Sequence, residues 1–339
     1  MGGVHPADVG LAEARALVRR AVDKAEQLGL RGAIAVVGAS GALVTASRLD
    51  HGGPGGMARA RSKAWISATQ QIPSSEHLQR MTTLPVPIST GFVTASPEAL
   101  FPGAGGLPVR DAAGTVIGGI SASGATVSPF LPAGVAPESV SADGKPANPE
   151  DLLIAYAMGT PYVGQHGDDE ARWKARFGDL VISPEASLGM KPASPATAQD
   201  ELDWALTLVD RVLAEATRQG LAVSVAIVDR GGDPIQQDRM DGAVAGGVEV
   251  ALATASAAAR FGIPSEHLAA WYPADQLAAL HPAPLLAAPG GLPIELNGQV
   301  VAGLGIGGAQ PARCAALARE ALTLAPTMPT PPTRPANPS

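Results

Sequence analysis

The strongest constraint on the fold is an internal duplication. Shifted by 191 positions, the segment Gly29–Asp50 matches Gly220–Asp241 at glycine, arginine and aspartate positions. Three further blocks match in the same order, with a shift that shortens slightly along the chain: Ile72-Pro73-Ser74 with Ile263-Pro264-Ser265, Gly105-Gly106-Leu107-Pro108 with Gly290-Gly291-Leu292-Pro293, and Gly114–Ala125 with Gly298–Ala309. Matched blocks in one order indicate two copies of one domain.

Each copy has the same predicted order of elements. A helix with one apolar stripe comes first, and a hairpin with a tight turn follows it. An alanine-rich helix, a second hairpin and a closing helix complete the copy. The small residues of the alanine-rich helix predict close packing against a sheet. The clearest predicted elements are strands at 33–38, 42–48, 223–229 and 234–239, alanine-rich helices at 57–71 and 244–261, a hairpin at 292–306 and a last helix at 312–324.

Short hairpin loops give antiparallel strand pairing, which excludes a parallel sheet wound through helical crossovers. We therefore expect an α+β fold: two tandem antiparallel sheets, each with helices packed on one side, in the layering of profilin and PAS domains. The predicted domains are 8–160 and 199–325. Between them, 161–198 is predicted to be a linker or a surface excursion, and the proline-rich end, 326–339, is predicted to be a disordered tail.

The composition excludes several classes of protein. The 24 Lys and Arg residues against 31 Asp and Glu residues give a net charge of −7, so nucleic acid is not an expected partner. The single cysteine, Cys314, excludes an internal disulfide and a site with only cysteine ligands. No spacing resembles a metal motif, and we expect no metal. No apolar run reaches about 18 residues and no signal peptide is evident, so we expect a cytoplasmic protein without membrane contact.

Charged residues repeat at the ends of two matched strands. Arg48 and Asp50 end a strand of the first copy, and Arg239 and Asp241 end its counterpart. The two-residue spacing points both side chains of a pair to the same face. An arginine oriented by an aspartate is suited to bind an anionic ligand. The alternative is an ion pair at a strand end or an interface.

Two glycine pairs also repeat, Gly105-Gly106 and Gly290-Gly291. Their backbone N–H groups are candidate donors to an anionic ligand. The alternative is a tight turn into a strand, which needs only the conformational freedom of glycine.

Two further side chains are candidates for catalysis. Lys63 lies on the alanine-rich helix, and if that helix packs on the sheet, burial lowers the pKa of the amine and makes it a candidate base or anion clamp. An exposed helix lysine is the alternative. His51 follows Asp50 and is a candidate general base or axial ligand.

The second copy reads VAIVDRGGDPIQQDRMDGA, then an alanine-rich helix, FGIPSEHL and GGLPIELNGQVVAGLGIGGA. This ordered set resembles the GlcG/HbpS family, also called the haem-degrading domain or DUF336. The family pattern joins R-x-D-G-A, K-A-x-T-A, G-G-x-P and a glycine-rich hairpin. The first copy keeps Lys63 but has His51-Gly52 after Asp50, whereas the second keeps Gly242-Ala243 after Asp241 but has Thr254 at the lysine position. Function is therefore either split between the copies or confined to one.

The resemblance implies an α+β sheet covered by helices, assembly into oligomers, and ligand binding, with haem as the ligand of some members. We therefore expect a homo-oligomeric small-molecule-binding protein with an anionic ligand, and with haem or another tetrapyrrole as its candidate cofactor. The alternative is a hydrolase, dehalogenase or isomerase that acts on a small carboxylated intermediate of aromatic-compound catabolism. In that case the Arg/Asp pairs bind the carboxylate, and Lys63 or His51 moves protons. A third hypothesis is an assembly scaffold.

Overall fold

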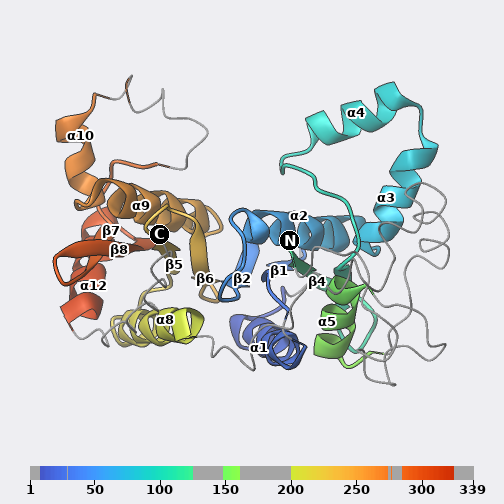
Figure 1. Cartoon of the computed structure of the whole chain (residues 1–339), viewed down its shortest axis with the longest axis horizontal. Helices are drawn as coiled ribbons and strands as arrows, with labels where there is room; N and C mark the ends of the chain where they lie inside the picture. The colour runs from blue at the N-terminus through green and yellow to red at the C-terminus, as the bar shows by residue number, and fades with distance from the viewer. Residues whose placement is uncertain are drawn as a thin grey trace, which may run out of the picture.

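The two halves of the chain build a single sheet. The computed structural model describes residues 8–28, 30–124, 148–160, 200–273, 276 and 285–323. Eight antiparallel strands lie in the order β3-β4-β1-β2-β6-β5-β8-β7 (Figure 1). The strands are β1 (Ala33–Gly38), β2 (Leu43–Arg48), β3 (Gly106–Arg110), β4 (Val116–Ser123), β5 (Ser224–Asp229), β6 (Pro234–Arg239), β7 (Gly291–Leu296) and β8 (Gln299–Gly307).

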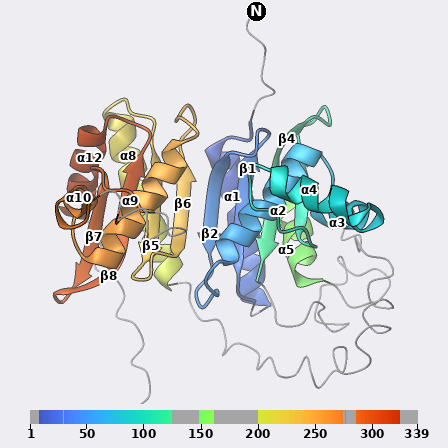
Figure 2. The same ribbon diagram turned by 90° about the horizontal axis from the view of Figure 1, so that it is seen from above.

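The halves meet at β2 and β6, which lie side by side at the centre of the molecule (Figure 2). Thr45 faces Asp238 and Ser47 faces Gln236 across this junction. Each half would leave one edge strand unpaired here, and the pairing of the two edges satisfies their backbone groups. The two separate sheets expected from the repeat are therefore one continuous sheet.

Helices cover both faces of this sheet (Figure 1). The antiparallel α+β fold with packed helices is confirmed, but the helices are not restricted to the one side that we expected. Strand β1 explains the difference, because Ile34 and Val36 pack toward the first helix while Ala35 and Val37 pack toward the alanine-rich helix. One face carries α1 (Leu11–Gln27), α5 (Pro149–Met158), α8 (Asp200–Arg218) and α12 (Pro311–Thr323), and the other carries α2 (Gly56–Gln70) and α9 (Gly247–Phe261).

The alanine-rich helices α2 and α9 lie directly on the strands. A Cβ atom added to Gly305 of β8 would lie 2.0 Å from the carbonyl oxygen of Ala251 in α9. Only glycine allows two backbones to come this close. The close packing predicted from the small residues is confirmed.

Shorter helices follow α2 and α9, and the loop segments that contain them differ between the halves. The first half has α3 (Ser74–Thr83) and α4 (Val86–Ala95), and the second has η2 (Ser265–His267) and α10 (Leu268–Trp271). Helix α4 was not predicted, and none of its residues is buried.

Two predicted segments cannot be compared with the structure. The expected linker at 161–198 and the tail at 326–339 lie outside the described residues, so the domain boundaries stay predictions. Among the residues that are described, no helix is both long enough and apolar enough to span a bilayer.

Candidate functional site

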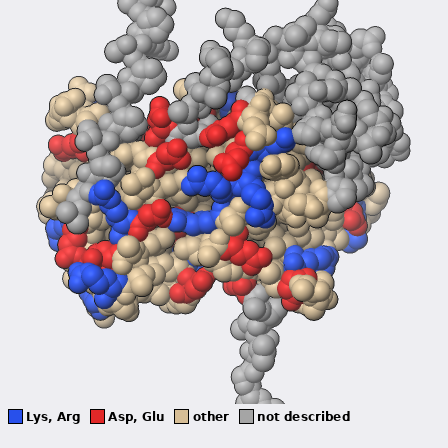
Figure 3. Space-filling view, turned by 90° about the horizontal axis from the view of Figure 1, so that it is seen from below, with Lys and Arg blue, Asp and Glu red and all other residues tan. Residues whose placement is uncertain are grey.

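A cavity of about 380 Å³ lies between α1 and α8, over the junction of β2 and β6. Small-molecule sites typically enclose about 300–1,000 Å³. Seen from below, the face that carries these helices has acidic and basic side chains close together near its centre (Figure 3). The cavity is lined by Arg15, Ala16, Val18, Arg19, Val22, Asp23 and Glu26 of α1, by Leu202, Asp203, Leu206 and Asp210 of α8, and by Thr45, Ser47 and Gln236 of the sheet. Both halves of the chain therefore contribute to it.

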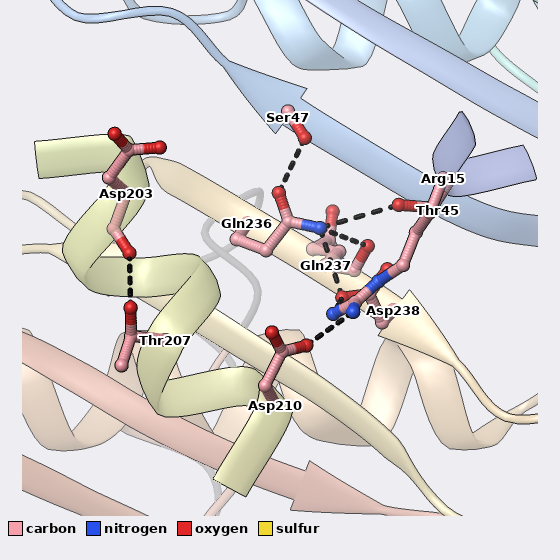
Figure 4. A network of polar contacts seen from close by, with 9 residues as sticks. All are labelled: Arg15, Thr45, Ser47, Asp203, Thr207, Asp210, Gln236, Gln237 and Asp238. Atoms are coloured by element: carbon pink, nitrogen blue, oxygen red, sulfur yellow. Dashed lines mark hydrogen bonds and ion pairs between the residues drawn. The ribbon is translucent and has the colours of Figure 1, made fainter. Parts of the chain in front are cut away.

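The floor of the cavity is polar although it is buried. Ser47 Oγ donates a hydrogen bond of 2.5 Å to Gln236 Oε1 (Figure 4). Gln236 Nε2 donates to Thr45 Oγ1 at 3.3 Å and to Asp238 Oδ2 at 3.0 Å. The four side chains share one face because residues two apart on a strand point the same way. A continuous polar strip therefore crosses from β2 to β6.

Arg15 reaches from α1 to this strip. Its Nη2 donates to Asp238 Oδ2 at 2.6 Å, and its Nη1 binds Asp210 of α8 (Figure 4). Burial opposes the charge of Arg15, but the two carboxylates outweigh this effect and raise its pKa. Within the described part of the chain, Arg15 Nε and Asp238 Oδ1 are buried atoms without a hydrogen-bond partner.

The other end of the cavity is acidic. Glu26 of α1 lies near Asp23 and Asp203, and burial together with these two carboxylates raises its pKa. Arg19 opposes the increase only in part. The lining as a whole carries four carboxylates and two guanidinium groups.

The two predicted aspartates hold the walls of the cavity. Asp50 accepts hydrogen bonds from the backbone N–H groups of Glu201 at 3.0 Å and Leu202 at 3.1 Å, at the start of α8. Asp241 accepts one from Leu11 at 3.0 Å, at the start of α1. Burial raises the pKa of Asp50, although its backbone hydrogen bonds oppose the increase. Each aspartate therefore caps the first helix of the opposite half.

The two predicted arginines also contact the opposite half. Arg48 is buried, and its Nη1 lies 2.8 Å from one carboxylate oxygen of Asp229 and 2.8 Å from one of Asp233. Arg239 Nε donates to the Leu43 carbonyl at 2.7 Å. The contacts of Arg48 correspond to the alternative of an ion pair at an interface, whereas Arg239 contacts a backbone carbonyl group there. Anion binding by the two arginines is not tested and stays a prediction.

Lys63 is buried, as the sequence suggested for an alanine-rich helix packed on a sheet. Its Nζ donates to Glu150 Oε2 at 2.5 Å and to the Ala104 carbonyl at 2.8 Å. Burial lowers the pKa of Lys63, and Glu150 opposes this effect. The second half has neither charge, because Thr254 replaces Lys63 and α12 carries Ala312 at the second position, where α5 carries Glu150.

The remaining predicted residues lie away from the cavity. His51 is exposed, in a turn where its φ is 61°. Gly105 N–H donates to Asp151 Oδ1 at 2.6 Å, and Gly291 N–H donates to Ser265 Oγ at 2.9 Å. Gly106 pairs with Ser121 across the sheet, and Gly290 accepts a hydrogen bond from Ile306. These contacts match the alternative of a tight turn, and ligand binding by the glycines stays a prediction.

The sequence did not lead us to Arg15, Thr45 or Gln236. A signal was present in the strand sequences LVTASR and PIQQDR, where polar residues occupy every second position: Thr45 and Ser47 in the first, and Gln236 and Asp238 in the second. When both faces of a sheet are covered, such alternation places polar groups under a helix. Among the described residues, no three His, Cys, Asp or Glu side chains are grouped so that they could hold a metal ion.

Comparison with known proteins identifies the repeated unit. The family model described as "Haem degrading protein HbpS-like" matches residues 9–129 and 201–323, once in each half. No curated protein sequence matches the chain.

Three similar solved structures each cover little more than a third of the chain. Klebsiella pneumoniae protein ORFY, assigned to the family model DUF336, is 27% identical over 36% of this chain and 87% of its own, with a TM-score of 0.34. A double mutant of Streptomyces reticuli HbpS is 28% identical over 37% of this chain and 86% of its own, with a TM-score of 0.34. The PduOC protein, solved as a haem complex, is 22% identical over 36% and 91%, again with a TM-score of 0.34.

Proposed function

The chain belongs to the HbpS-like family of haem-degrading proteins, whose model matches both of its halves, and we propose that it is a small-molecule-binding protein whose ligand occupies the cavity between α1 and α8. The observation that carries this proposal is the buried polar floor. Thr45, Ser47 and Gln236 are almost fully buried, yet they face a space of about 380 Å³. Polar groups in such a space are suited to orient a bound molecule.

The position of the cavity supports the same proposal. It lies where the two copies meet, and interfaces between domains are common places for ligand sites. A bound molecule would contact α1 and β2 of the first copy and α8 and β6 of the second. Neither copy alone could form this site.

Haem is the ligand that the family suggests, but the lining residues do not fit it. Haem iron is held by histidine, cysteine, methionine or tyrosine, and none of these residues lines the cavity. The anionic propionate groups would also meet an excess of carboxylates. We therefore propose a smaller polar ligand for this cavity, and binding of haem elsewhere on the chain remains a prediction.

The experiment compares Ala16→Trp with Ala12→Trp. Both residues are exposed on α1, but only Ala16 lines the cavity, so the first variant fills it and the second is a matched control. We expect at least one member of a panel of small polar metabolites of both charges to raise the melting temperature of the wild type and of Ala12→Trp, and not of Ala16→Trp. Equal shifts in all three proteins would place the ligand outside the cavity and overturn the proposal.

A haemin titration of the same three proteins tests the family ligand. A Soret shift at low micromolar haemin that persists in Ala16→Trp would support haem binding at another site. The absence of any shift would remove haem as a ligand. No contact of Lys63 or His51 favours the hypothesis of an enzyme, because neither lines the cavity. Assembly into a homo-oligomer and a cytoplasmic location also stay predictions, and light scattering tests the first.

A further inference from the structure

We infer that the cavity between α1 and α8 selects a small organic cation, an amine or a guanidine compound. This inference rests on the proposed function, because it concerns the ligand of the same cavity. It differs from the anionic ligand that the arginines at the strand ends suggested, and those arginines do not line this cavity.

The charges of the lining carry the inference. Arg15 is already held by two carboxylates, those of Asp210 and Asp238. The remaining charged groups of the lining are Arg19 and the carboxylates of Asp23, Glu26 and Asp203. Within the described part of the chain, none of these three carboxylates forms an ion pair. A cation bound between α1 and α8 would supply the missing positive charge.

The electrostatic state of Glu26 agrees with this charge count. The pKa of Glu26 is raised by burial and by the carboxylates of Asp23 and Asp203. Neighbouring negative charges raise the pKa of a carboxyl group because they disfavour its ionised form. A ligand ammonium group near Glu26 would favour the ionised form of Glu26.

The floor offers the hydrogen-bond acceptors that a cation requires. Ser47 gives its hydroxyl hydrogen to Gln236, so the two acceptor positions of Ser47 Oγ remain. Ser47 is 2% exposed and lines the cavity, so its hydroxyl group belongs to the buried floor. An N–H donor from the ligand would satisfy them.

An anion would find less support in the same space. The charge of Arg15 is neutralised by Asp210 and Asp238. Arg19 shares the lining with the three remaining carboxylates, which are those of Asp23, Glu26 and Asp203. Arg48 and Arg239 do not line the cavity. Of the described lining residues, only Arg19 is a cation without a carboxylate partner.

Isothermal titration of the full-length protein with three probes tests the inference. The probes share a four-carbon chain and differ in charge. Putrescine carries two positive charges, 1,4-butanediol carries none, and succinate carries two negative charges. We expect putrescine to bind, and its affinity to fall as salt is added, because screening weakens exposed charge interactions. We expect no binding of succinate.

Matched variants test whether the carboxylates of the lining contribute to putrescine affinity. Asp203→Asn and Glu26→Gln should each weaken putrescine binding about two- to fivefold, the range expected for one partly exposed charge pair. Asp200 and Glu13 lie on the same two helices but do not line the cavity. The control variants Asp200→Asn and Glu13→Gln should therefore leave the affinity for putrescine unchanged. Ala16→Trp should abolish binding.

The outcomes separate the two proposals. Tighter binding of succinate or butanediol that Ala16→Trp abolishes would overturn the cation inference and leave the proposed function intact. Putrescine binding that Ala16→Trp does not change, or that the acidic variants do not weaken, would overturn the inference as well. Absence of putrescine binding would also overturn it, and the metabolite panel then decides the proposed function independently.

Discussion

Asp50 and Asp241 make the same contact in opposite directions across the molecule. Asp50, two residues after β2, caps α8 of the second half, and Asp241, two residues after β6, caps α1 of the first half. The two capped helices are the walls of the cavity. The duplicated Arg-x-Asp motif therefore joins the halves and positions the candidate ligand site at the same time.

Removal of the cap at Asp50 should destabilise the protein. Asp50→Ala leaves the N–H groups of Glu201 and Leu202 without their acceptor, and we expect the free energy of unfolding in urea to fall by about 1–2 kcal/mol. Asp50→Asn retains an acceptor oxygen and should lose less. The adjacent exposed residue gives a control, since His51→Ala should change stability by less than about 0.5 kcal/mol. Equal stability of Asp50→Ala and the wild type would contradict the capping role.

Arg48 and Arg239 should differ although the repeat matches them. Arg48→Ala leaves the carboxylates of Asp229 and Asp233 close together without a cation, and we expect a loss of about 2 kcal/mol. Arg239→Ala removes a hydrogen bond to the Leu43 carbonyl, and its nearest carboxylate, Asp8, lies 3.9 Å away, so we expect about 1 kcal/mol. Chemical denaturation of both variants checks the order. If Arg48→Ala unfolds like the wild type but loses ligand, the anion-binding role is supported instead.

The local elements of this fold could be predicted, because the evidence for each lies within about 20 residues. Asn297-Gly298 forms the predicted turn between β7 and β8, and the alanine-rich helices begin and end within a few residues of their predicted bounds. Helix α4 could not be predicted, because no apolar stripe of it packs against a sheet. The acceptor role of Asp50 depends on a backbone group 151 positions away, and the repeat alone does not pair β2 with β6.

Substitutions of Lys63 and Glu150 should have strongly non-additive effects on the free energy of unfolding. Lys63→Thr leaves a carboxylate without its cation, and Glu150→Ala leaves a buried amine without its anion, so we expect each to cost about 2–3 kcal/mol. The double variant reproduces the residues that the second half has, Thr254 and Ala312, and should cost less than the sum by at least about 1 kcal/mol. A double-mutant cycle in urea measures this coupling. Strictly additive losses would show that the two side chains act independently.

Gly291 should be intolerant of a side chain. A Cβ atom there would lie 2.1 Å from the carbonyl oxygen of Thr254, so Gly291→Ala must push α9 away from β7, and we expect a loss of about 3 kcal/mol. Gly246 is the matched control, because a Cβ atom there meets nothing within 4 Å and its φ is −65°. Gly246→Ala should remain within about 0.5 kcal/mol of the wild type in thermal or chemical unfolding. A well-tolerated Gly291→Ala would contradict the close packing of helix on strand.

His77 should make stability depend on pH. It is 5% exposed, its ring lies 5.3 Å from that of Phe92, and its Nε2 has no hydrogen-bond partner among the described residues. Burial and the nearby Arg80 lower the pKa of His77 below its ordinary value of about 6.5. The unfolded chain then binds a proton at a higher pH than the folded protein does.

The stability that His77 contributes should therefore be complete above about pH 6.5 and be lost as the pH falls through the folded pKa. We expect the free energy of unfolding to drop between about pH 7.5 and about pH 5.5 by more in the wild type than in His77→Phe, which cannot titrate but keeps a ring beside Phe92. Urea titrations across this range measure both slopes. A histidine that is neutral in the folded protein and protonated in the unfolded chain must make the free energy of unfolding depend on pH. If His77→Phe has the same pH dependence as the wild type, that dependence therefore arises from other groups.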